Sequence, residues 1–316
     1  MSDSLALNPV AAMYFHRVVE SLYEDQSPLS DAVAESEQSV WFLRRRSGSA
    51  DVVAWTRGGF PEVFRERLPV LQMKGPFLSG VVLNLGHELL AVDRAGARIV
   101  VETEDPIVWF DVTPSGAVLC ISKAELGDET RLHIGSATMP ACCVAVGLIT
   151  GAVWTSDERA VFQQQTGSRR AERTEIVARE ANGQQLVWAT TNLLLSPEMG
   201  GSPRGRVFVA GGVMGSPMHG GWIVDSDGPV RRASIVDLPL YGRPWFLDDR
   251  SVVFPTNSNG THSLVEAGEV TARIHQLAER PGRSIALFPG TRRVVWAQPT
   301  KFGGRLAACD LSTNQV

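Results

Sequence analysis

The sequence lacks the segments that mark membrane-spanning and exported proteins. It contains no run of about 18 apolar residues, so no membrane-spanning helix is expected. Its first residues, Met1-Ser2-Asp3-Ser4, show neither the basic segment nor the apolar stretch of a signal peptide. Both absences predict a cytoplasmic protein without a membrane partner.

Cysteine is scarce, and its spacing is not that of a metal site. The chain has 4 cysteines, with no C-x-x-C pair and no Cys/His spacing typical of zinc: Cys120, Cys142, Cys143 and Cys309. Without an export signal, free thiols are expected. We therefore predict no cofactor, while the sequence leaves open a metal ion at a central channel.

An excess of basic charge is also missing. Lysine and arginine total 30 against 34 acidic residues, which gives a net charge of −4. This balance argues against nucleic-acid binding driven by phosphate neutralisation. The short basic runs Arg44-Arg45-Arg46 and Arg169-Arg170 are interpreted as solvated surface.

A repeated pattern dominates what the sequence does contain. Two apolar residues run into an aromatic residue or leucine at intervals of 41, 36, 43, 46, 46 and 42 residues, ending at Phe42, Leu83, Leu119, Phe162, Phe208, Phe254 and Trp296. A period of about 40–45 residues is typical of a four-stranded propeller blade. We predict an all-β fold, a seven-bladed β-propeller, over residues 29–316.

Further strand-like segments follow each of these anchors in the same phase. The segments predicted as third strands include Asp51–Arg57 and Glu88–Asp93, and turn signals such as Asn182-Gly183 follow them. The seventh repeat supplies only three strands before Val316. Because sheets avoid unpaired edges, we predict that residues 1–7 or 25–38 complete the last blade.

The N-terminal segment, residues 1–28, is predicted to hold a short helix over residues 8–24. Asn8 suits the N-cap and Pro9 the first helical position. One face would then be apolar, with Val10, Met13, Tyr14, Val18 and Leu22. Packing on the propeller is the first interpretation of this face, and dimerisation is the alternative.

Two segments resemble a known blade motif. Residues 153–162, with Trp154-Thr155-Ser156-Asp157, and residues 245–254, with Trp245-Phe246-Leu247-Asp248, resemble the W-S-P-D-G-x-x-I-A-F motif of TolB-type, WD-repeat-like propellers. The propeller domain of prolyl oligopeptidases has similar blades. The resemblance implies a fold and no activity, because the G-x-S-x-G elbow of the hydrolase domain is missing.

Loop lengths point to one functional face. The connections between second and third strands are long, as in Gln163–Arg173 and Ala210–His219, and in a propeller they emerge on the same face as the connections between blades. Elaborated loops on a rigid scaffold commonly carry function. We therefore predict a small-molecule pocket at the central channel on this face.

Candidate site residues come from these loops and from the starts of the axial strands. Tyr241 and Arg243 flank a glycine at such a start, and His219 has acid–base capacity. The candidate catalytic residues are His219, Tyr241 and Arg243; the candidate ligand-binding residues are Asp105, Asn192, Met214, His262 and Arg283. A structural role is the alternative for each, such as an ion pair between Arg243 and Asp237.

Two functions fit these features. The first is a small-molecule enzyme of lyase, cyclase or isomerase type rather than a hydrolase, because propeller enzymes of this kind leave no local sequence motif. The alternative is a non-catalytic scaffold for protein interactions, which predicts a broad exposed apolar patch. The chain is expected to be a monomer or a homodimer.

Overall fold

A computed structural model describes most of the chain. The described residues are 12–156, 159–166, 173–180, 182–192, 194–202, 204–212, 219–225, 231–233, 242–258, 261–268, 271–277, 281 and 284–312. Their regular structure is entirely β-strand. Within these ranges, therefore, no helix is present that would be long and apolar enough to cross a membrane.

The strands form antiparallel sheets that follow one another along the chain. One sheet contains β3 (Leu29–Ser36), β4 (Ser39–Arg46), β5 (Ser49–Thr56) and β6 (Glu62–Leu68). The next contains β7 (Gln72–Phe77), β8 (Gly80–Asn84), β9 (Glu88–Asp93) and β10 (Gly96–Glu102). A seven-stranded sheet then contains β11 (Ile107–Val112), β12 (Ala117–Lys123), β13 (Thr130–Ser136), β14 (Cys142–Ser156), β15 (Arg159–Thr166), β16 (Arg173–Arg179) and β17 (Gln185–Thr191).

Three further sheets complete the arrangement. The first contains β18 (Leu194–Leu195), β19 (Gly200–Gly201), β20 (Val207–Gly212), β21 (His219–Val224) and β22 (Arg231–Ala233). The second contains β23 (Trp245–Asp248), β24 (Ser251–Ser258), β25 (Thr261–Gly268), β26 (Ala272–Leu277) and β1 (Ala12–Arg17). The third contains β27 (Ile285–Leu287), β28 (Arg293–Thr300), β29 (Gly303–Asp310) and β2 (Glu20–Asp25).

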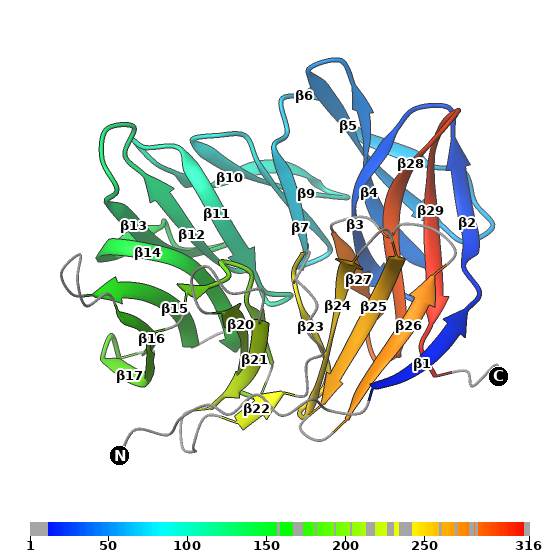
Figure 1. Cartoon of the computed structure of the whole chain (residues 1–316). Coiled ribbons are helices and arrows are strands. Elements are labelled where there is room, and N and C mark those ends of the chain that lie inside the picture. Colours follow the sequence, from blue (N-terminus) through cyan, green and yellow to red (C-terminus); the bar gives the residue numbers. More distant parts are fainter. Residues whose placement is uncertain are drawn as a thin grey trace.

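These sheets are arranged around a common axis, as Figure 1 shows, so the fold is an all-β propeller. The seven anchors of the sequence repeat lie on the second strands, and each is fully buried: Phe42, Leu83, Leu119, Phe162, Phe208, Phe254 and Trp296. They belong to apolar clusters, several of which join neighbouring sheets, for example β20 with β24 around Phe208 and Phe254. The apolar period of the sequence therefore reports the contacts between sheets.

The prediction of a seven-bladed propeller is confirmed in its all-β propeller fold, but the predicted number of blades does not match the described strands, which form six hydrogen-bonded sheets. The difference lies in β14, which continues without a break over 15 residues. Its first part pairs with β13, up to Gly147, and its second part pairs with β15, from Leu148 onward. The predicted boundary between the third and fourth repeats is thus a strand that both share.

The predicted N-terminal helix is also wrong over the described residues. Residues 12–17 and 20–25 are strands, and residues 8–11 lie outside the described part of the chain. Met13, Tyr14 and Val18 of the predicted apolar face are 43%, 61% and 73% exposed. The free edges of β26 and β29 offer backbone partners, and this pairing overrides the local helical periodicity.

Strand β2 supplies the outer strand of the sheet that contains β29. The two strands pair antiparallel, with Glu20 opposite Ala308 and Asp25 opposite Gly304. Residues 1–7 lie outside the described residues, whereas most of 25–38 forms the axial strand β3 instead of this edge. The pairing segment is therefore residues 20–25, which corrects the predicted choice.

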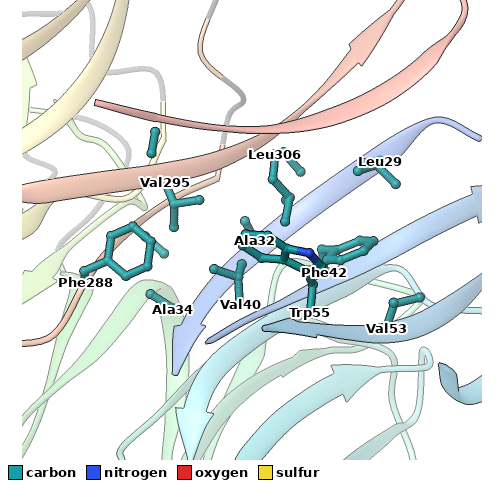
Figure 2. Packing of buried hydrophobic residues seen from close by; sticks show 13 residues of the cluster. Leu29, Ala32, Ala34, Val40, Phe42, Val53, Trp55, Phe288, Val295 and Leu306 are labelled. Atoms are coloured by element: carbon teal, nitrogen blue, oxygen red, sulfur yellow. The ribbon is translucent and has the colours of Figure 1, made fainter. Parts of the chain in front are cut away.

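The junction between the first and last sheets is strongly apolar. Figure 2 shows Phe42 and Trp55 of the first sheet facing Val295 and Leu306 of the last. Tyr23 of β2 covers this cluster, with its ring centroid 5.6 Å from that of Phe42 and 6.2 Å from that of Trp55. Sequence-distant strands thus share one core at the point of closure.

A buried polar network holds β1, which lies parallel to β26. Arg17 Nε donates to Nδ1 of His275 at 2.9 Å, and Nε2 of His275 lies 3.2 Å from a carboxylate oxygen of Glu266. His275 is fully buried, and Arg292 pairs with the other oxygen of Glu266 at 2.5 Å. The arginine donor requires an unprotonated Nδ1, so His275 is neutral here.

We expect the substitution Tyr23→Ala to destabilise the propeller by about 2 kcal/mol, because it exposes the apolar junction and removes the aromatic contacts. The free energy of unfolding from urea titration measures this. Tyr14→Ala is the matched control, since Tyr14 is 61% exposed on β1. An equal loss of stability in both variants would contradict a closing role for β2.

Stability should fall on acidification because of His275. Burial and the nearby Arg17 lower the pKa of His275 below its ordinary value of 6.5. The unfolded chain therefore takes up a proton first as the pH drops below about 6.5, and the free energy of unfolding decreases by up to about 1.4 kcal/mol per pH unit. Burial raises the pKa of Glu266, but its bonds to His275 and Arg292 outweigh this and lower it to about 2, so its contribution is lost only below its ordinary 4.5.

Urea titrations from pH 7 to pH 5 test the assignment to His275. The variant His275→Gln should show a flatter pH dependence than the unmodified protein. His16→Gln, at an exposed position, should keep the original dependence. Identical slopes in all three proteins would show that His275 does not carry the effect.

Candidate functional site

A cavity of about 810 Å³ lies among the axial strands. It is lined by residues at or near the starts of five axial strands, each from a different sheet: β3, β7, β11, β23 and β27. Asn84, at the end of the second strand β8, lines it as well. The cavity thus lies toward the end of the channel where axial strands begin, and its size is that of small-molecule sites.

Irregular backbone turns side chains toward the cavity. The pairing of β3 with β4 shifts register between Ser30 and Ala32, and Asp31 between them has φ of 46°. A non-glycine residue in this region is strained, and such bulges re-aim side chains near functional sites. The pairing of β11 shifts register at Val108, which also lines the cavity.

Lys74 on β7 is the most unusual group of the site. Its Nζ donates to the carbonyl oxygen of Phe110 at 2.5 Å and lies 3.4 Å from the centroid of the Trp109 ring. Burial, reinforced by the charge of Arg243, lowers the pKa of Lys74 to about 7. Near neutral pH, a large fraction of the amine is therefore unprotonated and able to accept a proton.

Arg243 is fixed beside the same cavity by a buried ion pair. Its Nη1 lies 2.6 Å from Oδ1 of Asp111 on β11, and its guanidinium carbon lies 4.7 Å from the centroid of the Trp245 ring. The other Asp111 oxygen accepts a hydrogen bond from the backbone N–H of Trp154 at 3.0 Å. The guanidinium is thus held by an acid and an aromatic face at once.

Two more carboxyl groups line the cavity. Asp31 is paired with Arg45 at 3.0 Å and accepts a hydrogen bond from the Ser30 hydroxyl. Within the described residues, the carboxylate of Glu198 has no hydrogen-bond or ion-pair partner. Burial raises the pKa of both carboxyls, although the nearby cations oppose it. Glu198 is therefore the freer proton donor of the two.

Of the predicted site residues, Arg243 lines the cavity. Asp105 pairs with Arg131 at 3.3 Å and lies outside the lining, and Asn192 is exposed at the end of β17. His219 begins β21 and His262 lies on β25, where only their backbone is described. The remaining candidates lie outside the described residues: Tyr241, Met214 and Arg283.

The sequence reasoning missed Lys74, although composition carried a signal. The chain has 27 arginines and only 3 lysines. Lys123 and Lys301 lie on or beside loops, whereas Lys74 lies at the axis. In a chain that otherwise uses arginine, a buried lysine stands out because its amine, unlike a guanidinium, readily loses its proton. Asp31 and Glu198 had no comparable signal.

The described residues contain no cluster of candidate metal ligands. No group of three or more His, Cys, Asp or Glu side chains within those ranges is arranged to hold a metal ion. This statement does not cover the candidates His219 and His262, because their side chains are not described.

Solved structures with similar folds were found at low sequence identity. An oligogalacturonate lyase in complex with manganese is 11% identical, with a TM-score of 0.63 and 93% of each chain covered. Virginiamycin B lyase from Staphylococcus aureus is 10% identical, with a TM-score of 0.62, covering 93% of this chain and 99% of that one. A prolyl endopeptidase structure is 10% identical, with a TM-score of 0.58, covering 89% of this chain and 46% of that one.

The chain is a β-propeller similar to that of prolyl endopeptidases. This confirms the resemblance found in the blade motif. No family model and no curated protein matches the sequence. At such low identities the likeness concerns the fold alone, so the chemistry must be argued from the cavity itself.

The substitution Lys74→Met should stabilise the protein at pH 7. Between the ordinary lysine pKa of 10.5 and the folded value of about 7, the unfolded chain binds a proton that the folded chain does not. Burial of Lys74 therefore destabilises the fold increasingly as the pH falls through this window, and fully below it. Removal of the amine should add about 1–4 kcal/mol at pH 7 and less near pH 10.

Thermal and urea unfolding at both pH values measure this effect. Lys123→Met, on a part-exposed strand end, should change stability by less than about 0.5 kcal/mol. If Lys74→Met is less stable than the unmodified protein at pH 7, the Lys74 side chain contributes favourably to the free energy of folding, and the prediction is wrong.

Proposed function

We propose that this protein is a propeller enzyme of lyase type, acting on a small molecule bound in the axial cavity. The observation that carries the proposal is that Lys74 and Glu198 both line one cavity of about 810 Å³. A base and an acid in one cavity suit reactions that move protons to and from carbon and a leaving group.

An elimination would use these groups in sequence. The unprotonated amine of Lys74 takes a proton from a carbon next to a carbonyl or carboxylate. The carboxyl group of Glu198 protonates the group that leaves from the neighbouring carbon, and a carbon–carbon double bond forms. Burial raises the pKa of Glu198 and lowers that of Lys74, which brings the two pKa values closer together and favours both roles near neutral pH.

Arg243 is the proposed orienting group. Its pairing with Asp111 at 2.6 Å and its contact with Trp245 fix the guanidinium before a ligand arrives. A fixed cation next to an indole suits an acidic or planar part of a ligand. Two fold neighbours are named as lyases, an oligogalacturonate lyase and a virginiamycin B lyase, which supports eliminative chemistry on this scaffold.

We also propose that the ring comprises seven repeats, counting each part of the shared seven-stranded sheet as one. In support, seven apolar clusters join consecutive repeats around the ring. An experimental structure with a different number of repeats would overturn this count. The boundary at residue 28, the cytoplasmic location, the oligomeric state and the scaffold alternative stay predictions from the sequence.

An elimination assay tests the proposed function. The protein is incubated with oligogalacturonate and with a panel of carboxylates that carry a leaving group on the neighbouring carbon, and ultraviolet absorbance reports the new conjugated double bond. We expect Lys74→Met to lower the rate at least about 100-fold, the usual contribution of a general base. Lys123→Met should keep the original rate.

Two outcomes would contradict the proposal. One is an elimination rate that Lys74→Met leaves unchanged, which would place the base elsewhere. The other is that no panel member reacts and none raises the melting temperature of the unmodified protein. This result would argue against a small-molecule site at the axis.

A further inference from the structure

The rarity of lysine in this chain points to a second chemical role for Lys74. Only 3 of the 30 basic residues are lysines, and this one is fully enclosed at the axis. Any base can accept a proton, whereas a bond to carbon is formed only by a nucleophile. An unprotonated primary amine is both, and lysines desolvated in apolar pockets form Schiff bases with carbonyl compounds.

The surroundings hold the Lys74 amine in place. A hydrogen bond to the Phe110 carbonyl oxygen, at 2.5 Å, and the face of the Trp109 ring, at 3.4 Å, fix the nitrogen. Trp109 is itself anchored, because its indole N–H donates to the Ala152 carbonyl oxygen at 2.8 Å. Neither contact consumes the nitrogen lone pair once the amine is unprotonated.

The charges that face Lys74 come from four other parts of the ring. They are the cation Arg243 and the acids Asp111, Glu198 and Asp31. Asp111 is bound to Arg243, and Asp31 is bound to Arg45. Lys74 thus has no dedicated carboxylate partner among the described residues, in contrast to a lysine that serves as a structural ion pair.

We infer that Lys74 is a nucleophile that forms an imine with an aldehyde or ketone bound in the axial cavity. This inference rests on the proposed function and names the carbonyl group as the feature its substrates share. The nitrogen lone pair adds to the carbonyl carbon while the oxygen takes a proton from the Glu198 carboxyl. The nitrogen then returns one of its protons to the Glu198 carboxylate, giving a neutral carbinolamine.

The second step releases water. The Glu198 carboxyl protonates the carbinolamine hydroxyl, which leaves as water, and Glu198 becomes a carboxylate. The nitrogen lone pair forms the carbon–nitrogen double bond of the iminium ion. Hydrolysis by water reverses both steps and restores the amine and the carboxyl. No oxidant or reductant takes part. The iminium would acidify the neighbouring carbon–hydrogen bond, which is the bond that an elimination breaks. On such carbonyl substrates the Glu198 carboxylate left by the dehydration takes this proton in place of the Lys74 amine.

Reductive trapping tests the inference. The unmodified protein is treated at pH 7 with glyoxylate, a small aldehyde that carries a carboxylate, together with cyanoborohydride, which reduces an iminium to a stable secondary amine. Peptide mass spectrometry then locates the adduct. Because the chain has 3 lysines, Lys123 and Lys301 serve as internal references for ordinary amines in the same sample.

We expect Lys74 to be labelled at least about tenfold faster than Lys123 and Lys301. Near its pKa about half of the Lys74 amine is unprotonated at pH 7, against fewer than about 1 in 1,000 for an ordinary lysine. Glu198→Gln should slow labelling at Lys74 and leave the two reference lysines unchanged. Lys74→Arg, which keeps a cation at the axis, should abolish the axial adduct.

Labelling of Lys74 no faster than that of the reference lysines would overturn the imine. Such a result would leave the proton-transfer role intact, because the elimination assay with Lys74→Met tests that role without trapping. Labelling that is fast at Lys74 but unaffected by Glu198→Gln would overturn the assignment of Glu198 as the acid. Circular dichroism of each variant confirms that it is folded before labelling.

Discussion

The antiparallel pairing of β2 with β29 is the contact on which the rest of the propeller depends, because a ring of sheets is held only when its last sheet is complete. The pairing gives β29 a hydrogen-bonded outer neighbour and brings Tyr23 over Phe42 and Trp55. Asp25 extends the junction through its ion pair with Arg44 at 2.8 Å. The first axial strand, β3, is thereby packed against the last sheet, and with it the bulge that presents Asp31 to the cavity.

The cavity in turn depends on the way axial strands converge. Each contributes few residues, so no single segment carries a recognisable active-site motif. Lys74, Asp111, Glu198 and Arg243 come from four different parts of the chain and lie near one another because the ring brings its axial strands together. Enclosure then changes their chemistry, since the low dielectric of the interior disfavours charge and shifts the pKa of an isolated amine or carboxyl toward neutrality.

A propeller of this shape serves unrelated proteins, so likeness to lyases and to a prolyl endopeptidase defines a scaffold and leaves the reaction to the side chains. In this chain those side chains are a lysine and a glutamate that form no ion pair within the described residues, beside an arginine paired with Asp111. Burial lowers the pKa of this lysine and raises that of this glutamate, because it disfavours their charged forms. Retained groups of this sort are characteristic of sites that act on a ligand.

The sequence by itself determined the all-β class, the repeat and the positions of most strands. These features follow from local patterns, because the second strand of a sheet needs an apolar anchor where it packs on the neighbouring sheet, as at Phe208 and Phe254. It also placed Arg243 at the start of an axial strand. Only the tertiary structure decided that β14 serves two repeats, that residues 12–25 are strands and not a helix, and that Lys74 is enclosed. The reason is that contacts with residues far away in the sequence determine which sheet edges are paired, how the ring closes and which side chains are buried. Local sequence propensity carries no information about these contacts.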